Sequence, residues 1–230
     1  ASLSNTSFSI SLWVRFSAFG NQTILGKNQE YLILTDTRGF RVALDSMVLG
    51  FEYDIDLLEW YHIVMSYDGG LNEDAVSFYV NGEKIFTYDT GTLTSQISNK
   101  ATTLTMGSIP PHDSTVTHLQ SEDRLHDVVL INRDITSSEA FELYKENNVS
   151  LFSGYSDIIS WWKLGENAED TVGTNNGSPT SGITFTKQDG CMPYLSYNGV
   201  RYVTIERLKF MYHELMSTPN FHRETEDDPL

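Results

Sequence analysis

The stretch WYHIVMSYDGGLNEDAVSFYVNGEKI, from Trp60 to Ile85, has the pattern of two successive β-hairpins. Residues 62–67 and 75–80 are rich in β-branched and aromatic types, which suit a pleated and half-buried surface. The pair Asn81-Gly82 then supplies the positive φ angles that a type I′ hairpin turn needs at both central residues. This one stretch therefore predicts three antiparallel strands, the last of them at residues 83–87.

The segments on either side also have the pattern of short strands separated by turns. Residues 8–16 alternate aliphatic and polar side chains with period two, and short strands are expected at residues 31–35 and 40–44. Residues 48–57 alternate in the same way, so we expect a strand along that whole range. Short strands broken by turns favour an antiparallel sandwich or jelly roll over a parallel βαβ fold.

One short helix is predicted after these strands. Thr136 or Ser137 can cap its first turn, and Glu139 can reach back to the N–H of the cap residue. The helix is expected to end near Asn147.

Four motifs in this order resemble the laminin-G-like, concanavalin-A-type jelly-roll domains. They are the stretch from Trp60 to Gly82, FSISLWVRF at residues 8–16, LTMG at residues 104–107 and LHDVVLINRDITSSEAFELYKEN at residues 125–147. The resemblance implies an all-β fold, a two-sheet antiparallel jelly-roll sandwich with its core in residues 8–147. The resemblance predicts the fold and does not predict the function, because proteins that share a fold can have different functional sites.

A fifth motif is out of order. The segment WWKLGE at residues 161–166, followed by TNNG at residues 174–177, resembles the motif that normally opens a laminin-G-like module. Here it comes last, an order that resembles structural proteins of tailed bacteriophages. The strand expected at residues 158–164 either closes a circularly permuted sandwich spanning residues 1–189 or is donated to a neighbouring copy.

Residues 190–230 are predicted to form a C-terminal tail. Apolar side chains recur at helical spacing over residues 203–216, which predicts an amphipathic helix. This helix either packs on the sandwich or docks onto a partner. Its expected interface residues are Ile205, Leu208, Met211, Tyr212 and Leu215.

The composition excludes several function classes. The chain has 31 Asp and Glu against 15 Lys and Arg, and its net charge of −16 repels nucleic acid and anionic membranes. No apolar run approaches the roughly 20 residues that a membrane helix needs. The one cysteine, Cys191, excludes an intramolecular disulfide framework and a multi-cysteine metal site, and this usage is normal for a bacterial or viral protein. We therefore expect no nucleic-acid partner and no membrane insertion.

Three carboxylates suggest an enzyme as one alternative. On the predicted strand 48–57, Glu52, Asp54 and Asp56 share one face, which is how laminarinase-like glycoside hydrolases of this fold arrange their catalytic carboxylates. The opposing interpretation is a solvated polar face on a very acidic protein, and a cation site is a third. We expect no enzyme, because the last position is an Asp and the flanking sequence of those hydrolases is absent.

Ligand and metal residues are expected at the sandwich surface. Neighbours on a strand face opposite sides, so either Trp161 or Trp162 is expected to point outward, to solvent, a partner or a ligand. The candidate ligand-binding residues are Trp162, Tyr53, Asp54 and Asp56. Calcium is the usual ion of laminin-G-like domains, and the resemblance implies a rim site with the candidate ligands Asp36, Asp45 and Asp113.

Two function classes remain open. The first is a non-enzymatic structural and adhesion protein on a virion surface, in the capsid or tail, which contacts other virion proteins or copies of itself and recognises host-surface glycans. The second is a secreted or cell-surface carbohydrate-binding, lectin-like module. A glycoside hydrolase is the third and weakest alternative.

Overall fold

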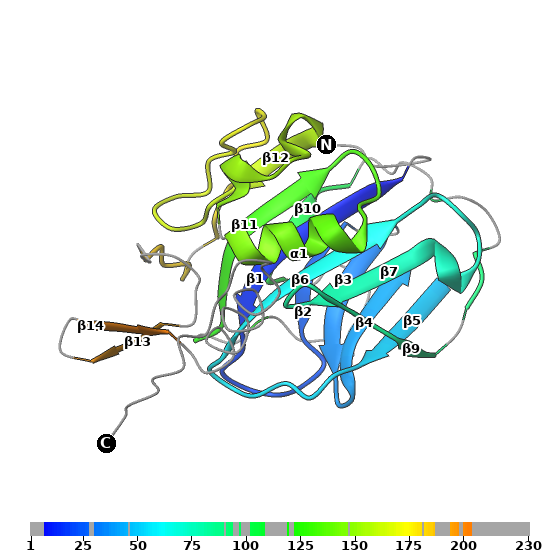
Figure 1. Cartoon of the computed structure of the whole chain (residues 1–230), viewed down its shortest axis with the longest axis horizontal. Helices are drawn as coiled ribbons and strands as arrows, with labels where there is room; N and C mark the ends of the chain where they lie inside the picture. Colours follow the sequence, from blue (N-terminus) through cyan, green and yellow to red (C-terminus); the bar gives the residue numbers. More distant parts are fainter. Residues whose placement is uncertain are drawn as a thin grey trace, which may run out of the picture. The chain divides into compact units, whose positions relative to one another are not determined.

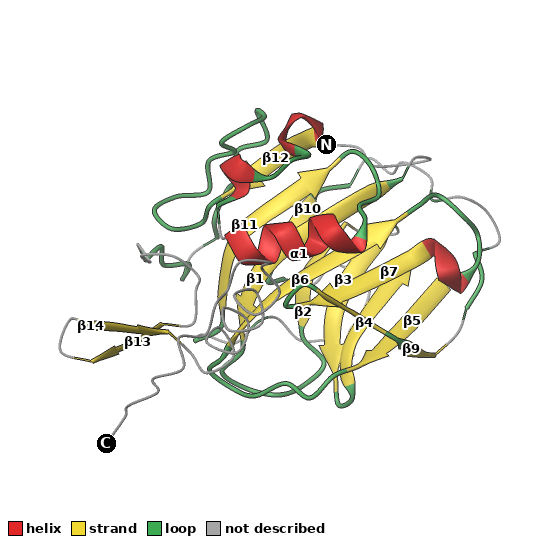
Figure 2. Cartoon of the chain, in the orientation of Figure 1, coloured by secondary structure: helices red, strands yellow, loops and turns green. Residues whose placement is uncertain are grey.

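The computed structural model describes residues 7–27, 30–45, 47–89, 91–93, 97, 102–108, 119, 122–146, 148–180, 182–186, 194–197 and 200–203. The chain divides into two compact units, Ala1–Cys191 and Met192–Leu230. The first unit holds two antiparallel sheets and a short helix (Figures 1 and 2). No helix in the described ranges is long and apolar enough to cross a membrane.

Each of the two sheets has six strands. The first sheet has the order β12-β11-β1-β6-β7-β8, and the second has the order β10-β2-β3-β4-β5-β9. The strands of the first sheet are β1 (Phe8–Arg15), β6 (Trp60–Tyr67), β7 (Val76–Val80), β8 (Glu83–Ile85), β11 (Arg124–Ile131) and β12 (Ile158–Trp162). Those of the second are β2 (Thr23–Lys27), β3 (Tyr31–Asp36), β4 (Gly39–Leu44), β5 (Met47–Glu52), β9 (Thr87–Asp89) and β10 (Leu104–Met106). All their pairings are antiparallel, so the predicted sandwich is confirmed.

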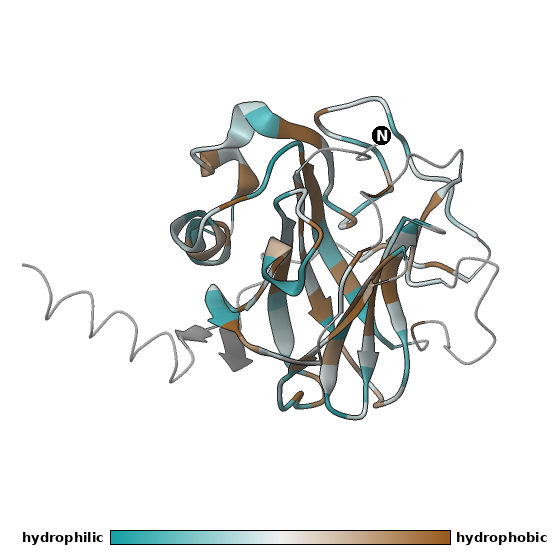
Figure 3. Cartoon of the chain, turned by 90° about the vertical axis from the view of Figure 1, so that its right-hand side faces the viewer, coloured by the Kyte–Doolittle hydropathy of each residue, from teal (hydrophilic) through white to brown (hydrophobic). Residues whose placement is uncertain are grey.

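Apolar side chains from the two sheets pack into one core between them. Figure 3 shows hydrophobic residues along the strands of the sandwich. Phe78 of β7 stacks on Phe51 of β5 with ring centroids 4.9 Å apart, and it lies 5.4 Å from the ring of Phe40 on β4. These contacts join the first sheet to the second. Burying each such ring stabilises the fold by roughly 1.5–3 kcal/mol. The alternation in the sequence places these rings on the inner faces of the two sheets, where they hold the sheets together.

The central hairpins form as predicted. Strands β6, β7 and β8 pair in succession, and the turn residues Asn81 and Gly82 have φ angles of 50° and 81°. Gly82 is also required for packing, because a Cβ there would lie 2.8 Å from Cδ2 of Phe141 in the helix α1 (Ser137–Glu146). The Asn-Gly turn therefore sets the register of the hairpin and leaves room for the helix.

The strand that comes last in the sequence closes the sandwich of its own chain. Strand β12 pairs antiparallel with β11, with Val128 opposite Trp162 and Leu130 opposite Ser160. The completing strand predicted at residues 158–164 is thus confirmed, with a shorter C-terminal end. Of the two arrangements that the sequence left open, the structure has the circularly permuted one.

The outer face of the first sheet carries a second apolar cluster beneath helix α1 and the 3₁₀ turn η2 (Val149–Leu151). Trp161 belongs to this cluster and is 5% exposed, while Trp162 is 4% exposed in the core between the sheets. The expectation that one tryptophan points outward is therefore wrong. The pair does face opposite sides, but both faces of this sheet are covered.

A loop anchored by Asp170 protects the free edge of β12. The buried Asp170 carboxylate accepts hydrogen bonds from the backbone N–H groups of Trp161, Gly173 and Asn175 at 2.9, 2.9 and 3.1 Å. Burial opposes its ionisation, but these donors outweigh burial and lower its pKa. A Cβ on Gly173 would lie 2.6 Å from the carbonyl oxygen of Ile159, so this loop needs glycine there. The TNNG motif thus has a structural role in this chain.

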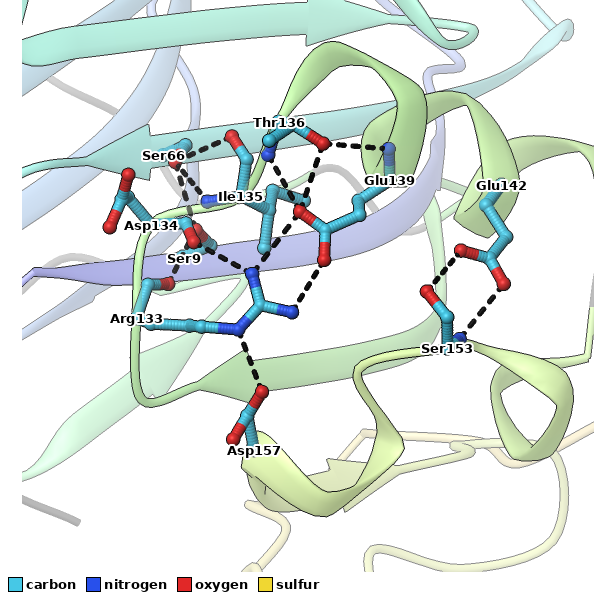
Figure 4. A network of polar contacts seen from close by, with 10 residues as sticks. All are labelled: Ser9, Ser66, Arg133, Asp134, Ile135, Thr136, Glu139, Glu142, Ser153 and Asp157. Carbon is cyan, nitrogen blue, oxygen red and sulfur yellow. Dashed lines mark hydrogen bonds and ion pairs between the residues drawn. The ribbon is translucent and has the colours of Figure 1, made fainter.

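Arg133 joins helix α1 to the strand that completes the sheet (Figure 4). Its Nε donates to Asp157 Oδ2 at 2.7 Å, and its two Nη atoms donate to the Glu139 carboxylate. Glu139 also accepts the backbone N–H of Thr136 at 2.8 Å, and Thr136 Oγ1 accepts the N–H of Glu139 at 3.3 Å. This reciprocal pair confirms the predicted capping box, with Thr136 as the cap.

His62 lies buried beneath the same helix. Its Nε2 is 2.8 Å from Ser11 Oγ, and its ring packs against Trp13 and Tyr144 with centroids 5.1 and 6.1 Å away. Burial lowers the pKa of His62 from 6.5 to about 3. Between these two pKa values His62 is neutral in the folded protein and protonated in the unfolded chain. Its burial therefore makes the folded state less stable as pH falls below 6.5.

The second unit contains a two-stranded sheet of β13 (Tyr194–Tyr197) and β14 (Val200–Val203). The predicted helix was expected to begin at Val203, where β14 instead ends. The remainder of that predicted helix lies outside the described residues. So do its expected interface residues, Ile205, Leu208, Met211, Tyr212 and Leu215.

Replacing Glu139 with Gln is expected to lower the free energy of unfolding by about 1–2 kcal/mol at pH 7. The hydrogen bonds from Arg133 are the main cause that lowers the pKa of Glu139 from 4.5 to about 2. The stabilisation is therefore full above pH 4.5 and is lost as pH falls toward 2. Urea unfolding at pH 7 and at about pH 3, between these two pKa values, measures the difference.

The matched control is Glu146→Gln, because Glu146 lies exposed on the same helix. It is expected to change the free energy of unfolding little at either pH. A loss for Glu139→Gln that stays the same across the pH range would contradict the assigned role of the ionised carboxylate.

Candidate functional site

Two loops meet at one end of the sandwich and form the loop rim, defined here as residues 16–22 and 53–59. The first loop links β1 to β2 and the second links β5 to β6, so both cross between the sheets at the same end (lower edge of Figure 1). The N–H of Leu58 donates to the Phe16 carbonyl at 2.7 Å, and Arg15 Nε donates to the Leu58 carbonyl at 3.0 Å. The end of β1 therefore holds the second loop in place.

The second loop begins earlier than the alternation in the sequence predicted. Strand β5 ends at Glu52, so the prediction of a strand over residues 48–57 is wrong in its second half. The N–H of Tyr53 donates to the Arg38 carbonyl at 3.0 Å, in the turn between β3 and β4. Gly39 permits this close approach, because its φ is 137° and a Cβ there would lie 2.6 Å from the Tyr53 nitrogen. The second half of the alternating sequence, from Tyr53 to Leu57, therefore lies in the loop that crosses the rim and not in a strand.

Three of the four predicted ligand-binding residues lie on this loop. Tyr53 is half-buried, and its ring lies 6.0 Å from Phe40 and 5.7 Å from Tyr61. Asp54 and Asp56 are exposed, and the N–H of Asp56 donates to Tyr61 Oη at 2.7 Å. A buried aromatic framework therefore supports two exposed carboxylates. Their role in binding stays a prediction.

The loop rim also exposes apolar side chains that the sequence interpretation missed. Phe19 is 56% exposed, Leu57 is 41% exposed and Leu58 is 52% exposed. Leu58 has a φ of 68°, a region that costs free energy for a bulky side chain and often occurs at functional sites. The two consecutive leucines were the one feature of the sequence that indicated an exposed apolar surface here. Nothing in the sequence indicated the positive φ angle of Leu58.

Trp162, the fourth predicted residue, is not at the rim. Its ring is buried in the core, and its Nε1 donates to the Asn175 carbonyl at 2.8 Å. Trp161 does not replace it at the surface, because its Nε1 donates to Asp127 Oδ1 at 2.7 Å and Lys163 Nζ lies 4.6 Å over its ring. Both tryptophans hold the permuted strand in the sheet, so a ligand does not reach either ring.

The three carboxylates of the hydrolase alternative lie in solvent. Glu52, with its side chain 69% exposed, forms an ion pair with Arg38 at 3.8 Å, and Asp54 and Asp56 are exposed. A glycosidase needs one carboxyl group whose pKa is raised by an apolar, water-poor pocket. The surroundings of these residues do not supply one.

The predicted calcium ligands do not converge. Asp36 Oδ2 pairs with Arg41 Nε at 2.6 Å, and its Oδ1 accepts the Arg38 N–H at 2.8 Å. Asp45 follows β4 at the opposite end from Asp36, since Asp36 pairs with Gly39 at the start of that strand. Asp113 lies outside the described residues. Within the described ranges no group of three or more His, Cys, Asp or Glu residues could hold a metal ion, and Asp36 and Asp45 do not lie together.

Comparison with known proteins gives matches that agree with this architecture. Residues 1–140 match the family model for the concanavalin A-like lectin/glucanases superfamily. A search of curated proteins found no match.

Solved structures resemble the chain at low sequence identity. A proposed carbohydrate-binding protein from Bacteroides ovatus has a TM-score of 0.61 at 18% identity, and the alignment covers 81% of this chain and 55% of that one. The chain thus spans little more than half of the Bacteroides protein. A heptameric SAP-like pentraxin from Limulus polyphemus has a TM-score of 0.51 at 14% identity, over 70% of this chain and 82% of that one. Such identities show a shared fold alone.

The family match covers more than half of the sequence, and the two antiparallel sheets agree with it. The chain therefore belongs to the concanavalin A-like lectin/glucanase superfamily, in its laminin-G-like family.

Proposed function

We propose that the protein is a non-enzymatic carbohydrate-binding and adhesion module that binds glycans at the loop rim. The observation on which the proposal rests is that exposed apolar and exposed acidic side chains occur together on the loop rim, whose second loop is held in place by hydrogen bonds. Phe19, Leu57 and Leu58 are between 41% and 56% exposed, and Asp54 and Asp56 lie on the same loop as the two leucines.

This pairing suits the two faces of a pyranose ring. The C–H groups of a sugar ring pack against apolar or aromatic side chains, while its hydroxyl groups donate to nearby oxygens. An ionised carboxylate accepts several hydrogen bonds, so Asp54 and Asp56 supply acceptors beside the apolar surface. The bonds from Leu58 to the end of β1 hold the loop in place before a ligand arrives, which reduces the entropy lost on binding.

The non-enzymatic part of the proposal rests on the surroundings of the acidic residues. Glycoside hydrolysis needs two carboxyl groups with different environments, one of them poor in water. Glu52, Asp54 and Asp56 are all exposed, so the same solvent surrounds each of them. Their position favours ground-state binding of a sugar over acid catalysis.

The setting in this proposal is a virion surface, in the capsid or tail, where the module contacts other virion proteins or copies of itself. Support comes from the order of the chain, in which the motif at residues 161–166 comes last, as in the tailed-bacteriophage structural proteins that it resembles. The single cysteine and the net charge of −16 add to it. A compact second unit at Met192–Leu230 offers a part that can dock separately. The alternative setting is a secreted or cell-surface lectin-like module.

Leu58→Ala is expected to weaken glycan binding by about tenfold, because it removes apolar surface that contacts the sugar. A glycan array identifies the ligand, and calorimetry with the strongest hit measures the change. The matched control is Leu71→Ala, since Leu71 is 46% exposed on the loop after β6, at the opposite end of the sandwich. Equal weakening by both variants would move the site away from the loop rim, and a blank array would refute glycan binding.

Removal of residues 192–230 is expected to convert a stable oligomer into monomers, because an amphipathic tail in an assembly interface holds copies together. Light scattering of the full chain and of the truncated chain measures both native masses. Circular dichroism of the truncated chain checks that the sandwich still folds. A full-length chain that is already monomeric would count against the virion setting and favour the lectin-like alternative.

A further inference from the structure

The charges around the loop rim are unevenly distributed. Residues 53–59 contain Asp54, Asp56 and Glu59 and no basic residue. The nearby arginines are engaged: Arg38 pairs with Glu52 at 3.8 Å, and Arg41 pairs with Asp36 at 2.6 Å. The second loop therefore presents unbalanced negative charge toward any ligand.

Arg15 contacts this loop through its side chain, whereas Arg38 contacts it through its backbone carbonyl, which accepts the N–H of Tyr53. The Nε of Arg15 donates to the Leu58 carbonyl at 3.0 Å, so one of its donors is used to brace the backbone. Residues 53–59 themselves carry three acidic side chains and no basic one, so this loop keeps an excess of negative charge. The net charge of −16 on the whole chain acts in the same direction at longer range.

The polar groups of the rim are also mostly acceptors. The carboxylates of Asp54 and Asp56 accept hydrogen bonds and donate none while they are ionised.

We infer that the loop rim selects sugars that carry no negative charge, with amine-bearing sugars bound most tightly, and rejects sugars that carry carboxylate or sulfate groups. This inference rests on the proposed function and names the ligand class of the same site. Hydroxyl and ammonium groups are donors that the rim acceptors bind. A sialic acid, a uronic acid or a sulfated sugar places a like charge beside Asp54 and Asp56 and finds no free cation among the described residues of the rim that would balance it.

The effect is large enough to measure. Two like charges about 4 Å apart repel by roughly 1 kcal/mol in water and by more near a protein surface, so the rejection is expected to reach at least about tenfold. Salt screens such repulsion, because the Debye length falls from roughly 30 Å at 0.01 M to 3 Å at 1 M. The difference between neutral and anionic ligands should therefore shrink as salt is raised.

The test is a paired glycan array in which every neutral glycan has an amine, a uronate and a sulfated counterpart on the same backbone, read with the full chain. We expect the hits to be neutral and amine-bearing glycans, with each anionic counterpart at least about tenfold weaker in low salt. The double variant D54N/D56N is expected to weaken the neutral and amine-bearing hits, which lose charged acceptors, and to weaken the anionic counterparts less, so that the gap narrows. The control D74N changes an exposed carboxylate on the loop between β6 and β7, at the other end of the sandwich, and should leave the gap unchanged.

Each outcome decides between the two proposals. Anionic glycans that bind as tightly as their neutral counterparts would overturn the charge selection and leave glycan binding standing. A gap that D54N/D56N leaves intact would also overturn it, since the rim carboxylates would not be its cause. An array with no hit in any class would refute the proposed function itself, and the charge selection with it.

Discussion

Strand β1 lies in the middle of the first sheet, with β6 paired along one edge and β11 along the other. The far edge of β11 needs a partner too, because an unpaired edge exposes a row of backbone N–H and C=O groups. Strand β12 supplies that partner, and the loop anchored by Asp170 covers β12 in turn. Since β1 continues directly into residues 16–22, the position of the loop rim depends on this closure.

The fold could be predicted largely from short-range signals. The hairpin from Trp60 to Ile85 combines strand-forming residues with an Asn-Gly turn, and each of these acts within a few residues of itself. The capping box of Thr136 and Glu139 is equally local. The outward tryptophan was predicted wrongly because period-two alternation shows which residues share a face and does not show what covers that face. Here helix α1 covers it, and Arg133 secures the helix to Asp157 just before β12.

The candidate site could be predicted only in part, for the same reason. Alternation identified Tyr53, Asp54 and Asp56 as neighbours on one segment, although that segment is a loop held by Arg38 and Gly39. The exposure of Leu58 follows from hydrogen bonds to the end of β1, which are contacts between residues far apart in sequence. Of the proposed calcium ligands, Asp36 ends β3 beside the start of β4 and Asp45 follows the far end of β4, so these two do not converge. The number of acidic residues in a sequence does not show which of their carboxylates lie close together in the fold.

The central claim is that β12 completes the sheet of its own chain. An isotope-filtered NOE experiment tests it most directly, in an equal mixture of labelled and unlabelled protein that was unfolded and refolded together. The account predicts NOEs between Leu130 on β11 and Ser160 on β12 within labelled chains, and none between a labelled and an unlabelled chain. NOEs between the two kinds of chain across this strand pair would show a donated strand and would contradict the account.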